Sequence, residues 1–128
     1  MKKICLLTLT ALLLLLTGCG EKEKHNEKYY QTVLCNKMDG VMEQSLMDRT
    51  RIDCLTDEYA IEVEFAKKWA ESVGQSLYYA HMTGKKPAVG FILDESKKDQ
   101  RHLKRLEILA DKYHITIFKL KKLNEKGE

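Results

Sequence analysis

The stretch over residues 59–65 constrains the fold most strongly, because its second half alternates between apolar and acidic side chains. The sequence YAIEVEF is typical of a β-strand, in which successive side chains point to opposite faces. Glu62 and Glu64 therefore share one face. The other face carries the apolar residues Ile61, Val63 and Phe65. Two glutamates on one strand face must be either exposed to solvent or supplied with a cation.

The segments around this strand predict a small α/β domain. The apolar spacing before Gly40 indicates a helix that includes residues 30–38, and Ser96 is a plausible N-cap for a later helix that ends near Tyr113. Further strands are predicted over residues 41–46, 51–55, 88–93 and 115–120, and a helix over 66–81 with Trp69 in its apolar stripe. This order, α-β-β-β-α-β-α-β, predicts a sandwich with a mixed central sheet and flanking helices.

Four carboxylates lie on the first three predicted strands, namely Glu43, Asp53, Glu62 and Glu64. Because neighbouring strands of a meander lie side by side, three of these carboxylates can converge. Such a cluster is unfavourable unless its members are protonated or bind a metal ion. Mg²⁺ or Mn²⁺ is the expected metal, since oxygen ligands suit both ions, and it would activate water for attack on a phosphodiester. The alternative is a solvated outer strand face.

The N-terminus has the features of an export signal. Residues 1–3 are basic at two positions, and the apolar run over residues 4–16 is shorter than the roughly 20 residues that span a bilayer. The residues that follow, Leu16-Thr17-Gly18-Cys19, resemble a bacterial lipobox. The resemblance implies a lipid-anchored protein of the cell envelope with Cys19 as the lipidated mature N-terminus. Gly20 rather than Asp after the cysteine favours the outer membrane, if the host has one.

The predicted domain organisation follows from this signal. Residues 1–18 are the expected signal peptide, 19–28 a lipidated cysteine with a charged tether, 29–123 the folded domain and 124–128 a tail. Cys35 and Cys54 lie in the folded domain, and an oxidising compartment permits a disulfide between them. The alternative is two small buried apolar side chains.

Charge is unevenly distributed along the chain. Residues 20–96 hold 14 acidic and 10 basic side chains, whereas residues 97–128 hold 10 basic and 5 acidic ones. The basic segment is therefore a candidate phosphate-binding face, although a solvated helix face gives the same pattern. The candidate nucleic-acid contacts are Tyr79, Arg101, Lys104 and Arg105.

Several motifs, taken in order, resemble the PD-(D/E)XK nuclease superfamily: Gly40-Val41-Met42-Glu43, Arg51-Ile52-Asp53, Ile61-Glu62-Val63-Glu64 and Gly74-Gln75-Ser76-Leu77-Tyr78-Tyr79. The resemblance covers about residues 29–120. It implies a restriction-endonuclease-like fold, with metal bound by Asp53, Glu62 and Glu43. Glu64 stands where the superfamily pattern has lysine. Lys68, or alternatively Lys67, takes the lysine role, and Gln75 completes the catalytic set.

Three functions remain open from the sequence. The first is a metal-dependent nuclease anchored to a membrane through its lipid. The second is an inactive envelope lipoprotein that uses the same fold for binding or as a structural module, and the replacement of lysine by Glu64 favours it. The third is a lipoprotein with an unrelated α/β fold. No particular protein partner is indicated by any of these patterns.

Overall fold

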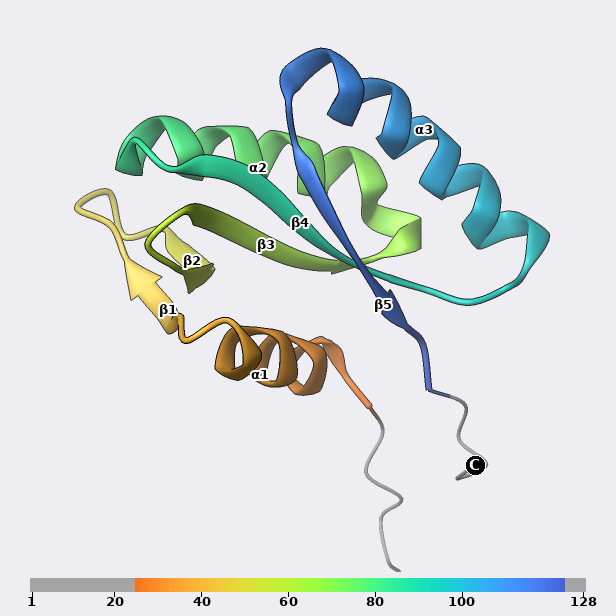
Figure 1. Cartoon of the computed structure of the whole chain (residues 1–128), viewed down its shortest axis with the longest axis horizontal. Helices are drawn as coiled ribbons and strands as arrows, with labels where there is room; N and C mark the ends of the chain where they lie inside the picture. The colour runs from red at the N-terminus through yellow and green to blue at the C-terminus, as the bar shows by residue number, and fades with distance from the viewer. Residues whose placement is uncertain (1–24, 124–128) are drawn as a thin grey trace, which may run out of the picture.

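A computed structural model describes residues 25–123, in which three α-helices flank a five-stranded mixed sheet (Figure 1). The predicted α/β architecture is confirmed, including the order of its elements. The elements are α1 (Glu27–Lys37), β1 (Val41–Ser45), β2 (Arg51–Leu55), β3 (Tyr59–Phe65), the 3₁₀ turn η1 (Ala66–Lys68), α2 (Trp69–Thr83), β4 (Lys86–Leu93), α3 (Lys97–Tyr113) and β5 (Thr116–Lys121). No helix among the described residues is long and apolar enough to cross a membrane.

The sheet has the strand order β1-β2-β3-β4-β5 and changes character at β3. The first three strands are antiparallel neighbours joined by short turns, whereas β3, β4 and β5 are parallel. A parallel pair needs a crossover connection, and α2 and α3 supply the two crossovers. Both crossovers lie on the same face of the sheet, and α1 covers the opposite face (Figure 1). Strands β3 and β4 are therefore covered on both sides.

This layering decides which way the two glutamates of β3 point. In the parallel register, Glu62 lies beside Val89 and Glu64 beside Phe91. Val89 and Phe91 belong to the apolar core that α2 and α3 cover. Because paired residues of neighbouring strands share a face, both glutamates point towards the α2 layer.

A disulfide joins α1 to β2 through Cys35 and Cys54, whose Cα atoms are 5.6 Å apart and whose side chains are fully buried. The chain between them must turn closely against the bond. Gly40 makes this possible, because a Cβ at that position would collide with both sulfur atoms. The disulfide thus fixes α1 against the strand that carries Asp53.

The helix ends match specific signals in the sequence. The Ser96 hydroxyl accepts a hydrogen bond from the Asp99 N–H at the start of α3, as expected of an N-cap. Gly84 ends α2 with a left-handed φ of 70°. Helix α1 begins at Glu27, inside the expected tether, because the Asn26 side chain caps it by accepting from the Tyr29 N–H.

One expectation about helix faces is wrong. The apolar spacing of the last predicted helix favours an inward Tyr113, but this residue lies at the last turn of α3, is exposed, and packs beside the Lys112 ammonium. In α2, Trp69 packs against the core as its place in the apolar stripe predicts, although it is only partly buried, and the buried side also includes Ser72 and Ser76. Both serine hydroxyls donate to backbone carbonyls of their own helix, which removes the cost of burying them.

Candidate functional site

The candidate site lies where β2 and β3 separate. The two strands pair through Leu55 with Ala60 and Cys54 with Ile61, and the described pairing ends there. Beyond this point the Asp53 carboxylate replaces a backbone acceptor, because its Oδ2 accepts the Val63 N–H at 2.8 Å. The side chain of Asp53 is thereby held at the opening between the strands, next to Glu62.

Four acidic side chains from three elements influence one another around this opening: Glu27 of α1, Asp53 of β2, and Glu62 and Glu64 of β3. We call them the carboxylate cluster. Glu62 is 6% exposed and Glu64 2%. The alternative of a solvated outer face for these two glutamates is therefore wrong, because α2 covers the side of the sheet to which they point. Burial of both glutamates calls for protons, a metal ion or a paired cation, and among the described residues Lys68 pairs with Glu64.

Burial shifts the protonation of the cluster. Loss of solvation is the largest cause that raises the pKa of Glu62 to about 9, and the charges of Asp53 and Glu64 act in the same direction. The pKa of Asp53 rises to about 6, again chiefly through burial, although its hydrogen bond from Val63 opposes the shift. At neutral pH the cluster therefore retains protons that exposed carboxylates would release.

Glu64 is stabilised in two ways. Its Oε2 forms an ion pair with Lys68 Nζ at 2.9 Å, so the lysine at the end of η1 reaches back to the strand. The other oxygen, Oε1, is buried and has no hydrogen-bond donor among the described residues. Burial and a carboxyl hydrogen bond with Glu64 raise the pKa of Glu27 to about 8. Glu27 therefore keeps its proton at neutral pH.

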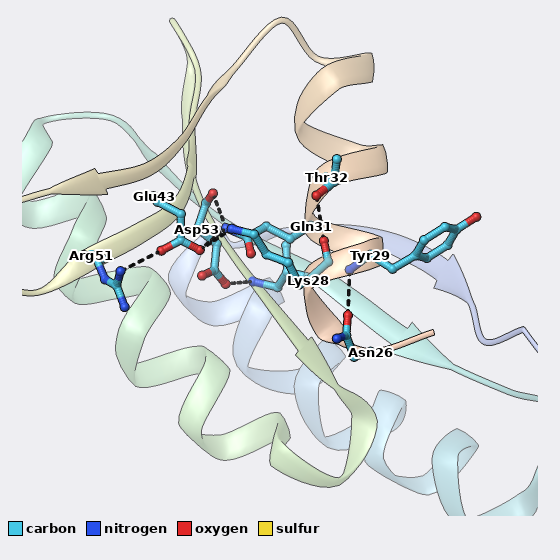
Figure 2. A network of polar contacts seen from close by, with 9 residues as sticks. Asn26, Lys28, Tyr29, Gln31, Thr32, Glu43, Arg51 and Asp53 are labelled. Atoms are coloured by element: carbon cyan, nitrogen blue, oxygen red, sulfur yellow. Dashed lines mark hydrogen bonds and ion pairs between the residues drawn. The ribbon is translucent and has the colours of Figure 1, made fainter. Parts of the chain in front are cut away.

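Glu43 lies beside the cluster in a different environment (Figure 2). Its Oε1 accepts from Lys28 Nζ at 2.7 Å and from Gln31 Nε2 at 2.9 Å, and its Oε2 is 3.4 Å from the Arg51 guanidinium. These contacts lower the pKa of Glu43, with the Lys28 hydrogen bond the largest cause. Glu43 is consequently ionised and neutralised by cations at neutral pH.

Helix α2 adds two polar side chains to the site. Tyr79 is 5% exposed, and its pKa is raised by burial and then by the charges of Glu62 and Asp53, so its hydroxyl lies near the carboxylate cluster. A hydrogen bond with Gln75 opposes this shift. The Gln75 Oε1 atom is buried and has no hydrogen-bond partner among the described residues. Gln75 therefore has an unused acceptor beside the Tyr79 hydroxyl.

The structure does not bring the predicted basic residues to the carboxylate cluster. Arg101, Lys104 and Arg105 are exposed on α3, and within residues 25–123 none of them forms an ion pair with the cluster. The Arg105 guanidinium instead lies 5.7 Å from the centre of the Trp69 ring. Of the two candidate lysines after β3, Lys68 contacts Glu64, whereas Lys67 lines a separate cavity.

The donor chemistry of the cluster suits a hard divalent cation, because its ligands would be carboxylate oxygens. The present side-chain arrangement is nevertheless not that of a formed metal site. In the part of the chain that the structure describes, no three His, Cys, Asp or Glu side chains are placed so that they could hold a metal ion. Protons and Lys68 occupy the cluster instead. Metal binding therefore requires release of protons and movement of at least one carboxylate.

Sequence reasoning missed three residues of α1 that complete the site, namely Glu27, Lys28 and Gln31. Gln31 is buried, and its amide bridges Glu43 Oε1 and the Asp53 carbonyl, the latter at 2.7 Å (Figure 2). The signal for Gln31 was its spacing of four residues from Cys35, which places both on one helix face. The signal for Glu27 was Asn26, a good N-cap residue directly before it.

Comparison with known protein families, with curated proteins and with solved structures finds no match to this chain.

Proposed function

We propose that the domain is a PD-(D/E)XK nuclease-like enzyme that hydrolyses phosphodiester bonds of nucleic acid with Mg²⁺ or Mn²⁺. One observation carries the proposal: Glu62 is buried beside Asp53 with a pKa of about 9, where an inert strand would have an apolar residue. Burying a carboxyl group at such a cost is typical of sites that perform chemistry. The order of motifs that resembles the superfamily supports the same assignment.

Each residue of the proposed site has a distinct role. Asp53 and Glu62 would hold the metal ion, with Glu43 as a further oxygen ligand from the edge of the site. A metal ion held there would supply Lewis-acid chemistry, polarising a phosphoryl oxygen and lowering the pKa of a water molecule. Lys68, paired with Glu64 at 2.9 Å, supplies positive charge for the phosphate that enters the site. Gln75 and Tyr79 orient that phosphate through the amide and the hydroxyl.

The test measures metal binding and cleavage on the same protein. We expect millimolar Mn²⁺ or Mg²⁺ to raise the melting temperature, because a ligand that binds only the folded state stabilises it. We also expect the chain to cleave single- or double-stranded DNA with either metal and not in EDTA. The proposal is contradicted if wild-type protein shows no thermal shift with either metal and cleaves no DNA.

A second candidate function is a non-catalytic binding or structural module of the cell envelope. It is favoured by Glu64 in the position of the superfamily lysine, and by the absence of a formed three-ligand metal site among residues 25–123. This candidate predicts no cleavage under any metal condition. A thermal shift with Mn²⁺ but no cleavage of DNA would favour it over the nuclease.

We propose that the domain is tethered outside the cytoplasm by lipid on Cys19, which lies outside the described residues. The disulfide between Cys35 and Cys54 is consistent with an oxidising compartment. Changing Cys19 to Ala is expected to abolish incorporation of labelled fatty acid and to leave the precursor uncleaved, because the lipid is attached to this sulfur. Cys5→Ala is the matched control. Normal labelling of Cys19→Ala would contradict the lipobox.

A further inference from the structure

A cavity of about 330 Å³ lies at the end of β3. None of the four residues of the carboxylate cluster lines it, and the proposed chemistry does not use it. It lies between the start of α1, the end of β3 with η1, the first turn of α3 and the end of β5. Its volume is at the lower end of the range of about 300–1,000 Å³ that small-molecule sites occupy. The cavity is therefore large enough for one nucleotide and too small for a nucleic-acid duplex.

The lining of the cavity combines one aromatic side chain with several charged ones. Phe65 supplies the aromatic surface, and Lys67 and Lys122 contribute two ammonium groups. The Lys122 ammonium lies 3.5 Å from Asp94 Oδ2. Asp99 contributes a carboxylate, and His25 an imidazole. In the part of the chain that the structure describes, Lys67 forms no ion pair. An anion is the expected partner for this lysine.

Neighbouring contacts hold these lining groups in place. The Phe65 ring packs edge-to-face with Tyr30, with ring centres 6.0 Å apart. The Tyr30 hydroxyl in turn accepts the Leu123 N–H at 2.8 Å, which fixes the end of the chain segment after β5. Asp99 Oδ2 accepts the Asp94 N–H at 3.1 Å. The aromatic wall and the carboxylate are thus preorganised.

The cavity is connected to the carboxylate cluster by three short stretches of backbone. Glu64 directly precedes Phe65, and Lys67 directly precedes the Lys68 that pairs with Glu64. On the opposite side, His25 lies two residues before Glu27. Phe65 points to the opposite face of β3 from Glu64, so the cavity and the cluster meet at the end of this strand. A strand of nucleic acid whose phosphate occupies the cluster has to pass around this end to place its adjacent nucleotide at the cavity.

We infer that the cavity binds one unpaired nucleotide next to the phosphate that is cleaved. The base lies against Phe65 and its exocyclic amino group donates to Asp99, while the phosphate lies between Lys67 and Lys122. This inference rests on the proposed nucleic-acid hydrolysis and specifies its substrate. A base enters the cavity only when it is unstacked and unpaired, which costs several kcal/mol in a duplex. The substrate is therefore single-stranded nucleic acid or a frayed end.

The test measures binding in EDTA, so that hydrolysis does not interfere, with full-length protein and a short fluorescent DNA strand. Changing Phe65 to Leu is expected to weaken binding about tenfold, because it removes base stacking but retains an apolar side chain. The same variant should bind an abasic strand like the wild type. The double variant Lys67→Gln/Lys122→Gln should bind both strands more weakly and reduce the salt dependence, by a slope of about 0.7 per lost phosphate contact.

The matched control is Lys37→Gln/Lys112→Gln, which removes two exposed lysines from the last turns of α1 and α3. It should bind like the wild type. The inference is overturned if the abasic strand binds wild-type protein as well as the normal strand does, or if the Lys67→Gln/Lys122→Gln variant is unaffected.

Cleavage measured in Mn²⁺ separates this inference from the proposed function. Wild-type cleavage together with unaffected cavity variants would refute the cavity and leave the nuclease. Base-dependent binding through Phe65 without any cleavage by wild type would refute the nuclease and support the cavity as a nucleotide site.

Discussion

Changing Asp53 to Asn is expected to lower metal-dependent DNA cleavage by at least about a hundredfold while the chain stays folded. A metal ion contributes several kcal/mol of transition-state stabilisation, and each 1.4 kcal/mol is about a tenfold change in rate. Asparagine retains an oxygen that can accept the Val63 N–H, so the local backbone of β3 keeps its partner. Loss of cleavage with an unchanged circular dichroism spectrum is the expected result.

The same substitution is expected to stabilise the metal-free protein. The pKa of Asp53 is raised to about 6, so its ionised form is disfavoured in the folded state at pH 7, and the neutral amide removes that penalty. The gain should be on the order of 1 kcal/mol in urea unfolding. The thermal shift caused by Mn²⁺ should become much smaller. An inert surface aspartate predicts none of these changes.

Asp57→Asn is the matched control for Asp53→Asn. Asp57 is exposed in the turn between β2 and β3. Its backbone carbonyl, rather than its carboxylate, accepts a hydrogen bond from Lys85 Nζ. Its substitution should leave cleavage, metal response and stability unchanged. Cleavage by Asp53→Asn at the wild-type rate would remove Asp53 from the metal site, and equal loss in both variants would point to damage of the hairpin instead.

Local sequence patterns predicted the elements of this fold because their signals are local. The alternation in residues 59–65 and the turn before it give the bounds of β3 as observed, and Ser96 and Gly84 mark helix ends through capping geometry. The face of α2 was harder to predict, because Ser72 and Ser76 satisfy their hydroxyls within the helix and can be buried. The spacing of apolar residues therefore does not reveal that a serine is buried when its hydroxyl donates to a carbonyl of its own helix.

The candidate site was predicted only in part for a similar reason. Glu62 and Asp53 were identified because both lie on predicted strands of one hairpin. Glu27 and Gln31 reach the site only after α1 is packed against β2 by the disulfide, and no strand pattern records that contact. The pairing of Lys68 rather than Lys67 with Glu64 likewise depends on the 3₁₀ turn after β3, where the sequence alone predicted a continuous helix.

The buried carboxylates also predict an unusual dependence of stability on pH. Glu62 has a pKa of about 9 and Asp53 a pKa of about 6 in the folded chain, whereas the ordinary pKa values of these side chains are 4.5 and 3.8. For each group, at a pH between its ordinary pKa and its pKa in the folded chain, the folded state binds more protons than the unfolded state. Stability from these two groups is therefore fully present at low pH and is lost as the pH rises through the folded pKa values.

We expect the metal-free domain to be more stable at pH 5 than at pH 8, by about 2–4 kcal/mol in urea unfolding with EDTA and without reductant. Most soluble proteins lack such a fall, because their carboxylates have lowered pKa values. Glu62→Gln should remove much of the difference, since the amide is neutral at both pH values. Glu58→Gln is the control, because Glu58 is exposed and its pKa is lowered by Lys86.

A divalent metal ion should reverse this trend. Metal and protons compete for the same carboxylates, so Mn²⁺ should stabilise the wild-type domain more at pH 8 than at pH 5. In Glu62→Gln this difference should be much smaller. A wild-type stability that is equal at the two pH values, or higher at pH 8 in EDTA, would show that Glu62 is ionised without penalty, and the carboxylate cluster would then hold neither excess protons nor a site that favours a metal ion.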